Sequence, residues 1–372
     1  MASFRSSRPR SRRRRVRAAA LTAAAAALVA SAVSAPAEAR SAAGVARTAA
    51  TGCGTGVGRV PLETTQDPAT GRWRLDDPVR GHHRTYDLRG ATSGPGVLVT
   101  DDDNSWCDTA AQADAVAAHY INAVVWDYFL TAHGRRGVRG DGTGGCSQVH
   151  YGNAYLNAFW ADDRGCMVWG SGASRPNDLF RIEVGAHEMT HGVTAATANL
   201  TYSGESGALN EATSDIFAAA VEFAANNPAD PGDYLFGERT DITGDHVDRR
   251  MDRPSWDGRS KDYWYPGIER LDVHSASGPA DHFFYLLAEG SGRKVINGVA
   301  YDSPTYDGKP VAGIGREAAA RIWYHALTNY MRANTTYHGA RDLTLKAAAD
   351  LYGAGSPQHT AVGAAWTAVN VG

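Results

Sequence analysis

The sequence predicts an α+β protein with two lobes, the first rich in β-strands and the second mainly helical. The chain has 372 residues, which is enough for two domains with a large buried core. Residues 54–100 are rich in Gly, Thr and Val and contain turn dipeptides, as is typical of short strands and hairpins. Beyond about residue 202, apolar residues recur at helical spacing. Strands followed by helices indicate the α+β class.

The first 39 residues have the pattern of an export signal. Arg12–Arg15 precede an apolar run over residues 18–33, and A-x-A cleavage sites end at Ala37 and Ala39. The run is short for a membrane span, so a retained anchor is the weaker alternative. The twin-arginine and general secretory routes both stay open. We expect a secreted, extracellular protein without stable membrane association after signal cleavage.

Residues 40–52 are expected to be a short spacer or pro-segment without regular structure. The chain after the leader carries 29 Lys and Arg against 39 Asp and Glu. This acidic balance argues against nucleic acid as a partner. No feature of the sequence indicates self-association, and we expect a monomer.

The regular elements follow in order along the two lobes. The N-terminal lobe is expected over residues 53–200 and the helical C-terminal lobe over 201–372. Residues 149–160 have the composition of a strand. Helices are predicted over residues 110–133, 179–195, 208–225, 280–289, 315–331, 343–351 and 360–369.

Four cysteines in an exported chain predict two disulfides. Cys53, Cys107, Cys146 and Cys166 allow three pairings. We favour Cys53–Cys107 and Cys146–Cys166, because the second pair brackets a predicted β-hairpin.

The predicted helix over residues 179–195 carries the most informative motif. His187 and His191 are four residues apart, so both imidazoles share one face and can bind one metal ion. Glu188, beside the first histidine, can accept a proton from water at an open coordination position. The pattern is typical of zinc hydrolases, most often metallopeptidases.

A third ligand is expected on the next helix. Glu211 and Asp215 are again four residues apart and share one face. One of the two carboxylates can bind zinc. The other can accept the free ring N–H of a ligating histidine and so fix its tautomer.

The same two helices predict a second cation site. Glu183 lies four residues before His187, and Glu222 lies three helical turns after Glu211. If the helices pack antiparallel, these carboxylates meet, which is unfavourable unless a cation separates them. Calcium is the expected ion, with Asp233 and the Leu235 carbonyl as further oxygen ligands. A solvated acidic cluster is the alternative.

Four segments in this order resemble the thermolysin family of secreted neutral metallopeptidases. The resemblance covers about residues 54–372, and the four motifs together are highly specific. They are VHYGNAYLNAFW (149–160), GAHEMTHGVT (185–194), SGESGALNEATSD (203–215) and VHSASG (273–278). The first resembles the family's substrate-binding edge strand, and the last resembles the segment of its second catalytic histidine.

The resemblance implies a secreted zinc endopeptidase with a two-lobed fold and the zinc site in the cleft between the lobes. It implies one catalytic zinc and one or more structural calcium ions. The implied roles are zinc binding by His187, His191 and Glu211, general base catalysis by Glu188, oxyanion stabilisation by Tyr202 and His274, substrate binding by Asn157, the Ala158 carbonyl and Arg249, support of His187 by Asp215, and calcium binding by Glu183, Glu222, Asp233 and Leu235.

The chain also departs from the family pattern. Ala219 replaces an acid of the family's double-calcium site. Only residues 40–52 separate the predicted cleavage site from the catalytic body, whereas the family usually has a large propeptide, so the route of maturation stays open. Asp248 stands where leucine is frequent, and Arg175 and Asp178 fall in a normally apolar stretch, so a preference for polar or basic side chains is a hypothesis.

Several alternatives remain at this stage. Either Asp272 or Glu269 can orient His274, and the sequence does not choose between them. The competing functions are a zinc deacylase or esterase, a non-catalytic binding protein of the same fold, and a closed structural metal site. The peptide-binding residues argue against the first, and the intact set with Glu188 argues against the other two.

Overall fold

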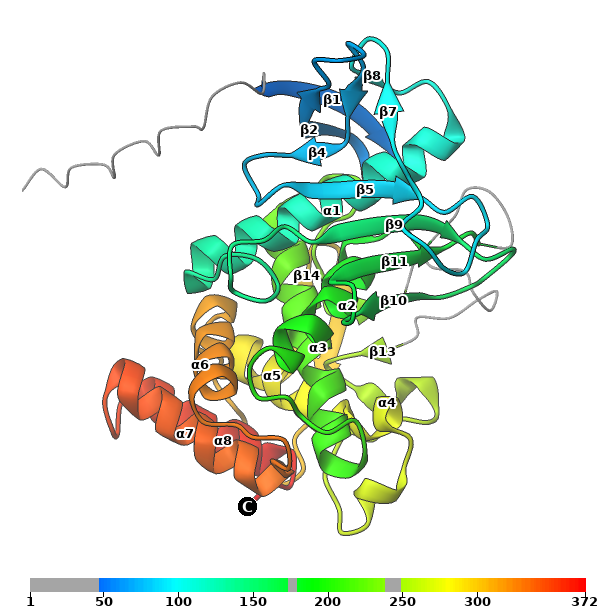
Figure 1. Ribbon diagram of the computed structural model, residues 1–372. Coiled ribbons are helices and arrows are strands. Elements are labelled where there is room, and N and C mark those ends of the chain that lie inside the picture. Colours follow the sequence, from blue (N-terminus) through cyan, green and yellow to red (C-terminus); the bar gives the residue numbers. More distant parts are fainter. Residues whose placement is uncertain (1–46, 173–178, 238–248) are drawn as a thin grey trace, which may run out of the picture. The chain divides into compact units, whose positions relative to one another are not determined.

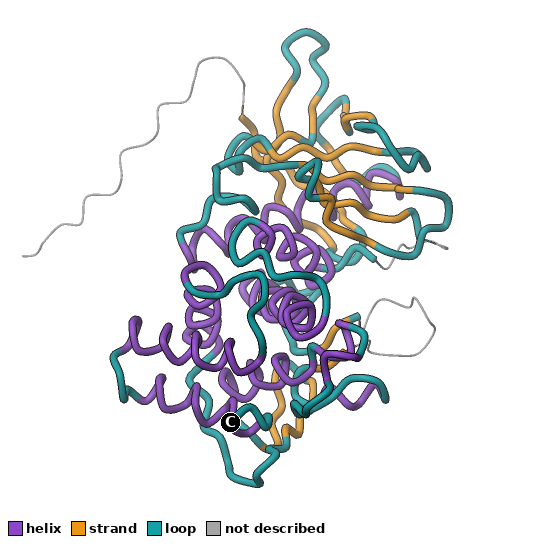
Figure 2. Tube along the Cα trace, turned by 60° about the horizontal axis from the view of Figure 1, so that its bottom comes forward, coloured by secondary structure: helices purple, strands orange, loops and turns teal. Residues whose placement is uncertain are grey.

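The strands lie mainly in the first half of the chain and the helices in the second, which confirms the predicted α+β class. The structure is a computed structural model that describes residues 47–172, 179–237 and 249–372 (Figures 1 and 2). The predicted signal peptide, residues 1–39, lies outside the described residues, as do Arg175, Asp178 and Asp248. No helix in the described part of the chain is long and apolar enough to cross a bilayer.

Two sheets form the β-rich part. The first has the order β7-β3-β2-β1-β8, and the second has the order β10-β11-β9-β5-β4 with β6 paired to β5. The strands are β1 (Arg47–Gly54), β2 (Gly58–Gln66), β3 (Trp73–Arg74), β4 (Asp76–Asp77), β5 (His83–Asp87), β6 (Val97–Leu98), β7 (Thr100–Asp101), β8 (Ser105–Trp106), β9 (Cys146–Tyr151), β10 (Ala158–Ala161) and β11 (Cys166–Gly170).

Helices dominate the rest of the described chain, with two small hairpins among them. The helices are α1 (Ala110–His133), α2 (Ile182–Ala195), α3 (Gly204–Ala225), α4 (Val273–Ala276), α5 (Gly278–Glu289), α6 (Arg316–Asn329), α7 (Tyr337–Tyr352) and α8 (Pro357–Ala368). The remaining strand pairs are β12 (Leu235–Phe236) with β13 (Arg249–Arg250), and β14 (Gly292–Ile296) with β15 (Val299–Ser303).

Helix α1 has the predicted bounds because both its ends are capped. The Thr109 side chain accepts a hydrogen bond from the Gln112 backbone N–H at 3.1 Å. Gly134 ends the helix with a φ of 68°, a left-handed conformation that favours glycine. α1 packs against β1, β5 and β9 and against α2, so it joins the sheets to the helix that carries the histidine motif (Figure 1).

Two predictions about the β-rich part were wrong, and one hairpin of the helical part was missed. Residues 47–52 of the expected spacer form most of β1. This strand pairs with β2 along its whole length, and the pairing satisfies backbone N–H and C=O groups of β1. The expected strand over residues 149–160 is two strands, because the chain turns at Gly152 and Ala154, both with positive φ. The hairpin β14–β15 was not predicted, although its Asn297-Gly298 turn is a strong hairpin signal.

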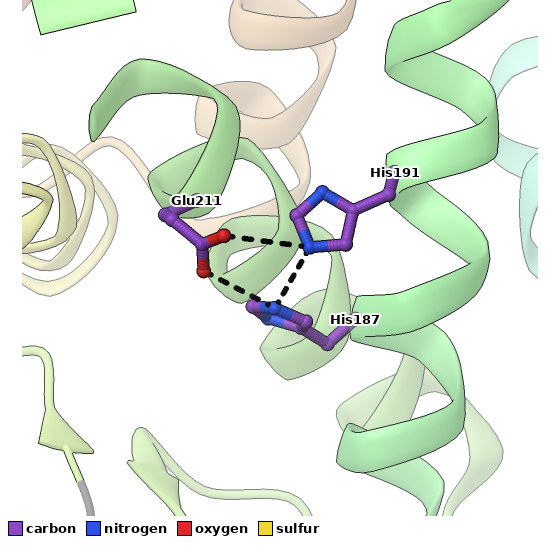
Figure 3. A group of neighbouring side chains, drawn as sticks. All are labelled: His187, His191 and Glu211. Atoms are coloured by element: carbon purple, nitrogen blue, oxygen red, sulfur yellow. Dashed lines mark hydrogen bonds and ion pairs between the residues drawn. The ribbon is translucent and has the colours of Figure 1, made fainter. Parts of the chain in front are cut away.

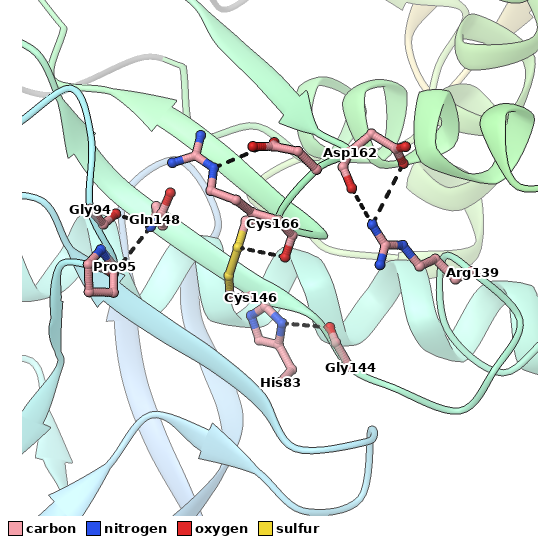
Figure 4. The surroundings of a disulfide bond; sticks show 11 residues. His83, Gly94, Pro95, Arg139, Gly144, Cys146, Gln148, Asp162 and Cys166 are labelled. Atoms are coloured by element: carbon pink, nitrogen blue, oxygen red, sulfur yellow. Dashed lines mark hydrogen bonds and ion pairs between the residues drawn. A yellow bond between two sulfur atoms is a disulfide. The ribbon is translucent and has the colours of Figure 1, made fainter.

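Both favoured disulfides are present. Cys53 bonds to Cys107, and Cys146 bonds to Cys166 (Figure 4). The reason given for the second pair was wrong, since Cys146 and Cys166 face each other on the parallel strands β9 and β11, while the hairpin is β10–β11. The bond therefore fixes the central strands of the sheet whose edge strand is β10.

Helix α2 is held tightly between strands and helices. It contacts β10 and β11 as well as α1 and α3. A Cβ atom added at Gly192 would lie 2.5 Å from the Trp160 ring on β10, so only glycine fits here. This close approach places the edge strand directly beside the histidine-bearing helix.

Candidate metal centre and active site

Two helices bring the three predicted zinc ligands together. His187 and His191 project from α2 toward Glu211 on α3 (Figure 3). The His187 Nε2 atom lies 3.2 Å from His191 Nε2 and 3.4 Å from Glu211 Oε2, and His191 Nε2 lies 3.6 Å from Glu211 Oε1. A tetrahedral zinc ion with bonds near 2.0–2.1 Å separates its ligand atoms by about 3.3 Å. The three side chains therefore have the spacing that such an ion requires.

The outward-facing ring nitrogens of both histidines are occupied. His187 Nδ1 lies 2.7 Å from Asp215 Oδ1, the partner that the family resemblance implied. His191 Nδ1 lies 2.8 Å from Asn210 Oδ1, and the Asn210 amide donates to the Leu200 carbonyl at 3.0 Å. Acceptors at Nδ1 leave both Nε2 atoms free to bind a metal. The role of Asn210 was missed, and its position beside Glu211 was the only signal.

The donor set fits a divalent transition metal. Glu211 is fully buried, and its Oε2 atom has no hydrogen-bond partner among the described residues. A buried carboxylate oxygen is costly to leave unsatisfied, and a cation bound by the two Nε2 atoms would satisfy it. Two imidazoles and one carboxylate also match the ligand preference of zinc.

Charges crowd this site and shift its pKa values. Burial opposes the charge of His187, but Asp215 and Glu211 outweigh it and raise its pKa to about 10. Burial and the neighbouring His187 charge lower the pKa of His191 to about 4. Burial raises the pKa of Glu188 to about 7, which is close to the value that suits a general base near neutral pH.

Tyr202 and His274 lie on the side of Glu211 that faces α4. The Tyr202 hydroxyl donates to Glu211 Oε1 and lies 3.4 Å from His274 Nε2. Both side chains are about half exposed. They can therefore reach a ligand that enters from solvent.

Asp272 is the acid that orients His274. Its Oδ1 atom lies 2.9 Å from His274 Nδ1 and also accepts the His274 backbone N–H at 3.1 Å, as the N-cap of α4. These hydrogen bonds lower the pKa of Asp272. Glu269 instead lies 3.7 Å from Arg270. The geometry thus decides between the two alternatives that the sequence left open.

The expected substrate-binding residues lie around the same site. Asn157 is exposed at the start of β10, and its side chain accepts the Ala158 backbone N–H at 2.9 Å. β10 lies at the edge of its sheet in the described chain, where its backbone can pair with an added strand. Arg249 on β13 makes a bidentate pair with Asp215 at 2.7 and 2.8 Å. Arg249 is therefore tied to His187 through one shared carboxylate.

A second acidic cluster lies at the other end of α2 and α3. Carboxylate oxygens of Glu183, Glu222 and Asp230 lie within 4.8 Å of one another, and all three residues are buried. Since His191 meets Glu211 and Glu183 meets Glu222, the two helices are antiparallel, as assumed. Burial and the neighbouring acids raise the pKa of Glu222 well above its ordinary value.

Asp233 contacts this cluster through its backbone N–H, and Leu235 contacts Asp233. The Asp233 N–H donates to Glu222 Oε2 at 2.9 Å, and the Asp233 carboxylate accepts the Leu235 N–H at 2.7 Å. Asp230 was missed by the sequence analysis. Its signal was its place in the same acidic stretch, eight residues after Glu222.

Known proteins share both the sequence and the fold. Residues 49–195 match the family model "Thermolysin metallopeptidase, catalytic domain", and residues 198–371 match "Thermolysin metallopeptidase, alpha-helical domain". The transglutaminase-activating metalloprotease of Streptomyces mobaraensis is 55% identical over 326 residues, covering 87% of this chain and 42% of the relative. A thermolysin of Bacillus caldolyticus is 40% identical over 332 residues, covering 85% and 57%.

Among solved structures, the precursor of protealysin, a metalloproteinase from Serratia proteamaculans, aligns with a TM-score of 0.61 and 27% identity. The alignment covers 78% of this chain and 87% of the solved chain. The chain spans about half the length of the curated relatives that it matches. Two adjacent family models and these relatives give one assignment: the chain belongs to the thermolysin family of metallopeptidases.

Proposed function

We propose that the protein is a secreted, zinc-dependent endopeptidase that hydrolyses internal peptide bonds of proteins. One observation carries this proposal: His187, His191 and Glu211 converge at zinc-ligand spacing with Glu188 adjacent on the same helix. Membership of the thermolysin family implies a catalytic zinc. Secretion rests on the leader sequence, in which residues 1–39 are the proposed signal peptide. The proposed lobes cover residues 53–200 and 201–372, and β1 extends the β-rich lobe back to residue 47.

His187, His191 and Glu211 would hold the ion, with Asp215 and Asn210 orienting the rings. Zinc, when bound, supplies a Lewis acid that polarises the peptide carbonyl and lowers the pKa of water. Glu188 takes the proton of the attacking water and delivers it to the leaving amine. A pKa near 7 suits both halves of this transfer.

The remaining residues hold the substrate and its developing charge. Tyr202 and His274 donate hydrogen bonds to the carbonyl oxygen as it becomes an oxyanion. Asn157 and the Ala158 carbonyl bind the peptide backbone along the edge strand β10. Arg249, already fixed by Asp215, binds a substrate carbonyl on the other side.

Zinc removal tests the activity directly. We expect dialysis against a zinc chelator to abolish casein digestion, and stoichiometric zinc in a calcium-containing buffer to restore it. Release of internal fragments, read by mass spectrometry, separates an endopeptidase from an exopeptidase. Digestion that persists in zinc-free protein would contradict the proposal. Ester or amide deacylation without any cleavage of peptides would instead favour the alternative of another zinc hydrolase.

Asp272 is proposed as a positioning residue for His274. We expect Asp272→Asn to lower kcat/KM for peptides by about 10–100-fold, by analogy with the loss of partners that orient metal-bound histidines. The matched control, Glu269→Gln, should retain full activity. The zinc content and thermal melting temperature of both variants should equal those of the unchanged protein. An equal loss in the two variants would show that Asp272 does not act through His274.

The buried cluster at the far end of α2 and α3 is proposed as a calcium site. Glu183, Glu222, Asp233 and the Leu235 carbonyl are the expected ligands, and the structure adds Asp230 as a candidate. Several buried carboxylates close together favour a hard cation with oxygen ligands. The ion would be structural, because it would bind the same two helices that carry the zinc ligands.

A further inference from the structure

A cationic groove lies behind the strand that carries Arg249. It is a hollow of about 570 Å³ formed by β13, the short 3-10 helix over Pro254–Asp257 and the hairpin β14–β15. Four basic side chains line it, against two acids. The basic residues are Arg250, Arg253, Arg293 and Lys294.

The acids leave this groove with excess positive charge. Asp252 is buried and forms an ion pair with Arg250, with 2.7 Å between Asp252 Oδ1 and Arg250 Nε. Asp302 is shared between Arg253, at 3.8 Å, and Arg293, at 3.5 Å. The Arg293 side chain is 88% exposed. Because the chain after the leader has ten more acids than bases, a local excess of cations here runs against the overall charge.

The groove also has apolar walls and a fixed backbone. The Arg250 guanidinium lies 5.1 Å from the centre of the Trp256 ring, and Trp256 and Val295 are 65% and 71% exposed. Arg250 donates to the Ala300 carbonyl at 3.0 Å, and Arg253 donates to the Asp302 carbonyl at 2.8 Å. These bonds hold the arginines on the hairpin before any ligand arrives, which lowers the entropy cost of binding.

Strand β13 connects the groove to the candidate active site. Successive side chains of a strand point to opposite faces. Arg249 points toward Asp215, the partner of His187, while its neighbour Arg250 points into the groove. The groove thus lies on the face of β13 opposite to Asp215, and a substrate segment bound at Arg249 reaches it by running past the strand.

We propose that this groove, named here the basic exosite, binds a carboxylate-rich segment of the polypeptide substrate outside the cut bond. The inference rests on the proposed peptidase function. Arginine guanidinium groups pair with carboxylates in bidentate geometry, and the exposed Trp256 and Val295 suit apolar residues between the acids. The acidic balance of the rest of the chain disfavours nucleic acid as the occupant.

Peptides with different tails test the basic exosite. The substrates share one uncharged cleavage sequence and carry no tail, a Glu-rich tail or a Lys-rich tail, placed at either end in turn. We expect the Glu-rich tail at one end to raise kcat/KM by about tenfold at low salt through electrostatic steering and capture. The gain should fall as ionic strength rises, because the Arg293 side chain is 88% exposed and its charge is screened by salt.

The variant and its control carry the same change in charge. Arg293→Glu with Lys294→Glu reverses two groove cations, each only loosely paired, at 3.5 and 3.9 Å from an acid. Lys309→Glu with Arg321→Glu reverses two exposed cations that do not line the groove, at 3.2 and 3.9 Å from an acid. The first double variant should lose the tail effect and keep its activity on the untailed peptide. The control should keep both.

The outcomes separate this inference from the proposed function. If the unchanged protein cuts no peptide at all, the peptidase proposal fails. If it cuts the untailed peptide but gains nothing from a Glu-rich tail, or if the gain survives in the groove variant, the basic exosite is wrong. Fluorescence anisotropy on Glu188→Gln gives a second reading of tail binding without turnover. Tighter binding of a single-stranded oligonucleotide than of the acidic peptide would also overturn the proposal.

Discussion

Replacing Glu188 with Gln is expected to lower kcat for peptide hydrolysis by roughly 10²–10⁴-fold, the range over which a positioned general base contributes. The amide has nearly the shape of the carboxylate but cannot accept the proton of water. Burial raises the pKa of the Glu188 carboxyl group to about 7, so its environment suits proton transfer. Steady-state kinetics on an uncharged internally quenched peptide would measure the loss.

The zinc content decides whether the loss is chemical. Glu188→Gln should bind one zinc per chain, because the nitrogen and oxygen atoms that converge belong to other residues. His187→Ala, by contrast, should lose both zinc and activity. Substantial peptide hydrolysis by a zinc-loaded Glu188→Gln protein would refute the role of Glu188 as general base.

Calcium is expected to raise the thermal melting temperature by about 4 °C at a hundredfold excess over its Kd. Such an excess stabilises the folded state by about 2.7 kcal/mol, and a protein of this size gains about 1.5 °C per kcal/mol. Glu222→Gln should lose most of this shift, because one buried ligand oxygen no longer carries charge. Differential scanning calorimetry with calcium and with a calcium-selective chelator would measure it.

The pH dependence gives an independent check on this site. Burial and the neighbouring acids raise the pKa of Glu222 in the folded, calcium-free protein. The folded state therefore holds a proton that the unfolded state releases, and stability without calcium should fall as pH rises above the ordinary carboxyl range. Calcium should remove this fall. Glu317→Gln, at an exposed position on α6, should show the calcium shift unchanged, and an equal loss there would argue against the proposed site.

Helical spacing predicted which side chains converge, because it determines which side chains share a face. The convergence of His187 and His191 with the acids of the next helix needed only two helices in contact, and the choice of Glu211 over Asp215 came from the family resemblance. The capped ends of α1 were equally local signals, and its bounds were predicted correctly. The roles of Asn210 and Asp230 were harder to predict from the sequence. Asn210 meets His191, and Asp230 meets Glu183 and Glu222, only after the intervening chain has folded.

The errors in the β-rich part have a common physical cause. A strand is completed by a partner that is distant in sequence, so the strand character of residues 47–52 depends on β2 and β8 rather than on their own composition. The break between β9 and β10 depends on positive φ values at Gly152 and Ala154, and an alanine gives little warning of such a conformation. Asp272, rather than Glu269, contacts His274 because it also caps α4.

Under the proposed function, the bidentate contact of Arg249 with Asp215 links metal retention and peptide recognition thermodynamically. The same carboxylate neutralises the guanidinium and draws the proton of His187 Nδ1. A peptide that pulls Arg249 toward its own carbonyl leaves Asp215 more available to that imidazole and strengthens it as a donor to the metal. By reciprocity, loss of the ion weakens the hold on the peptide by the same factor. Substitutions at Arg249 are therefore expected to alter both binding equilibria together.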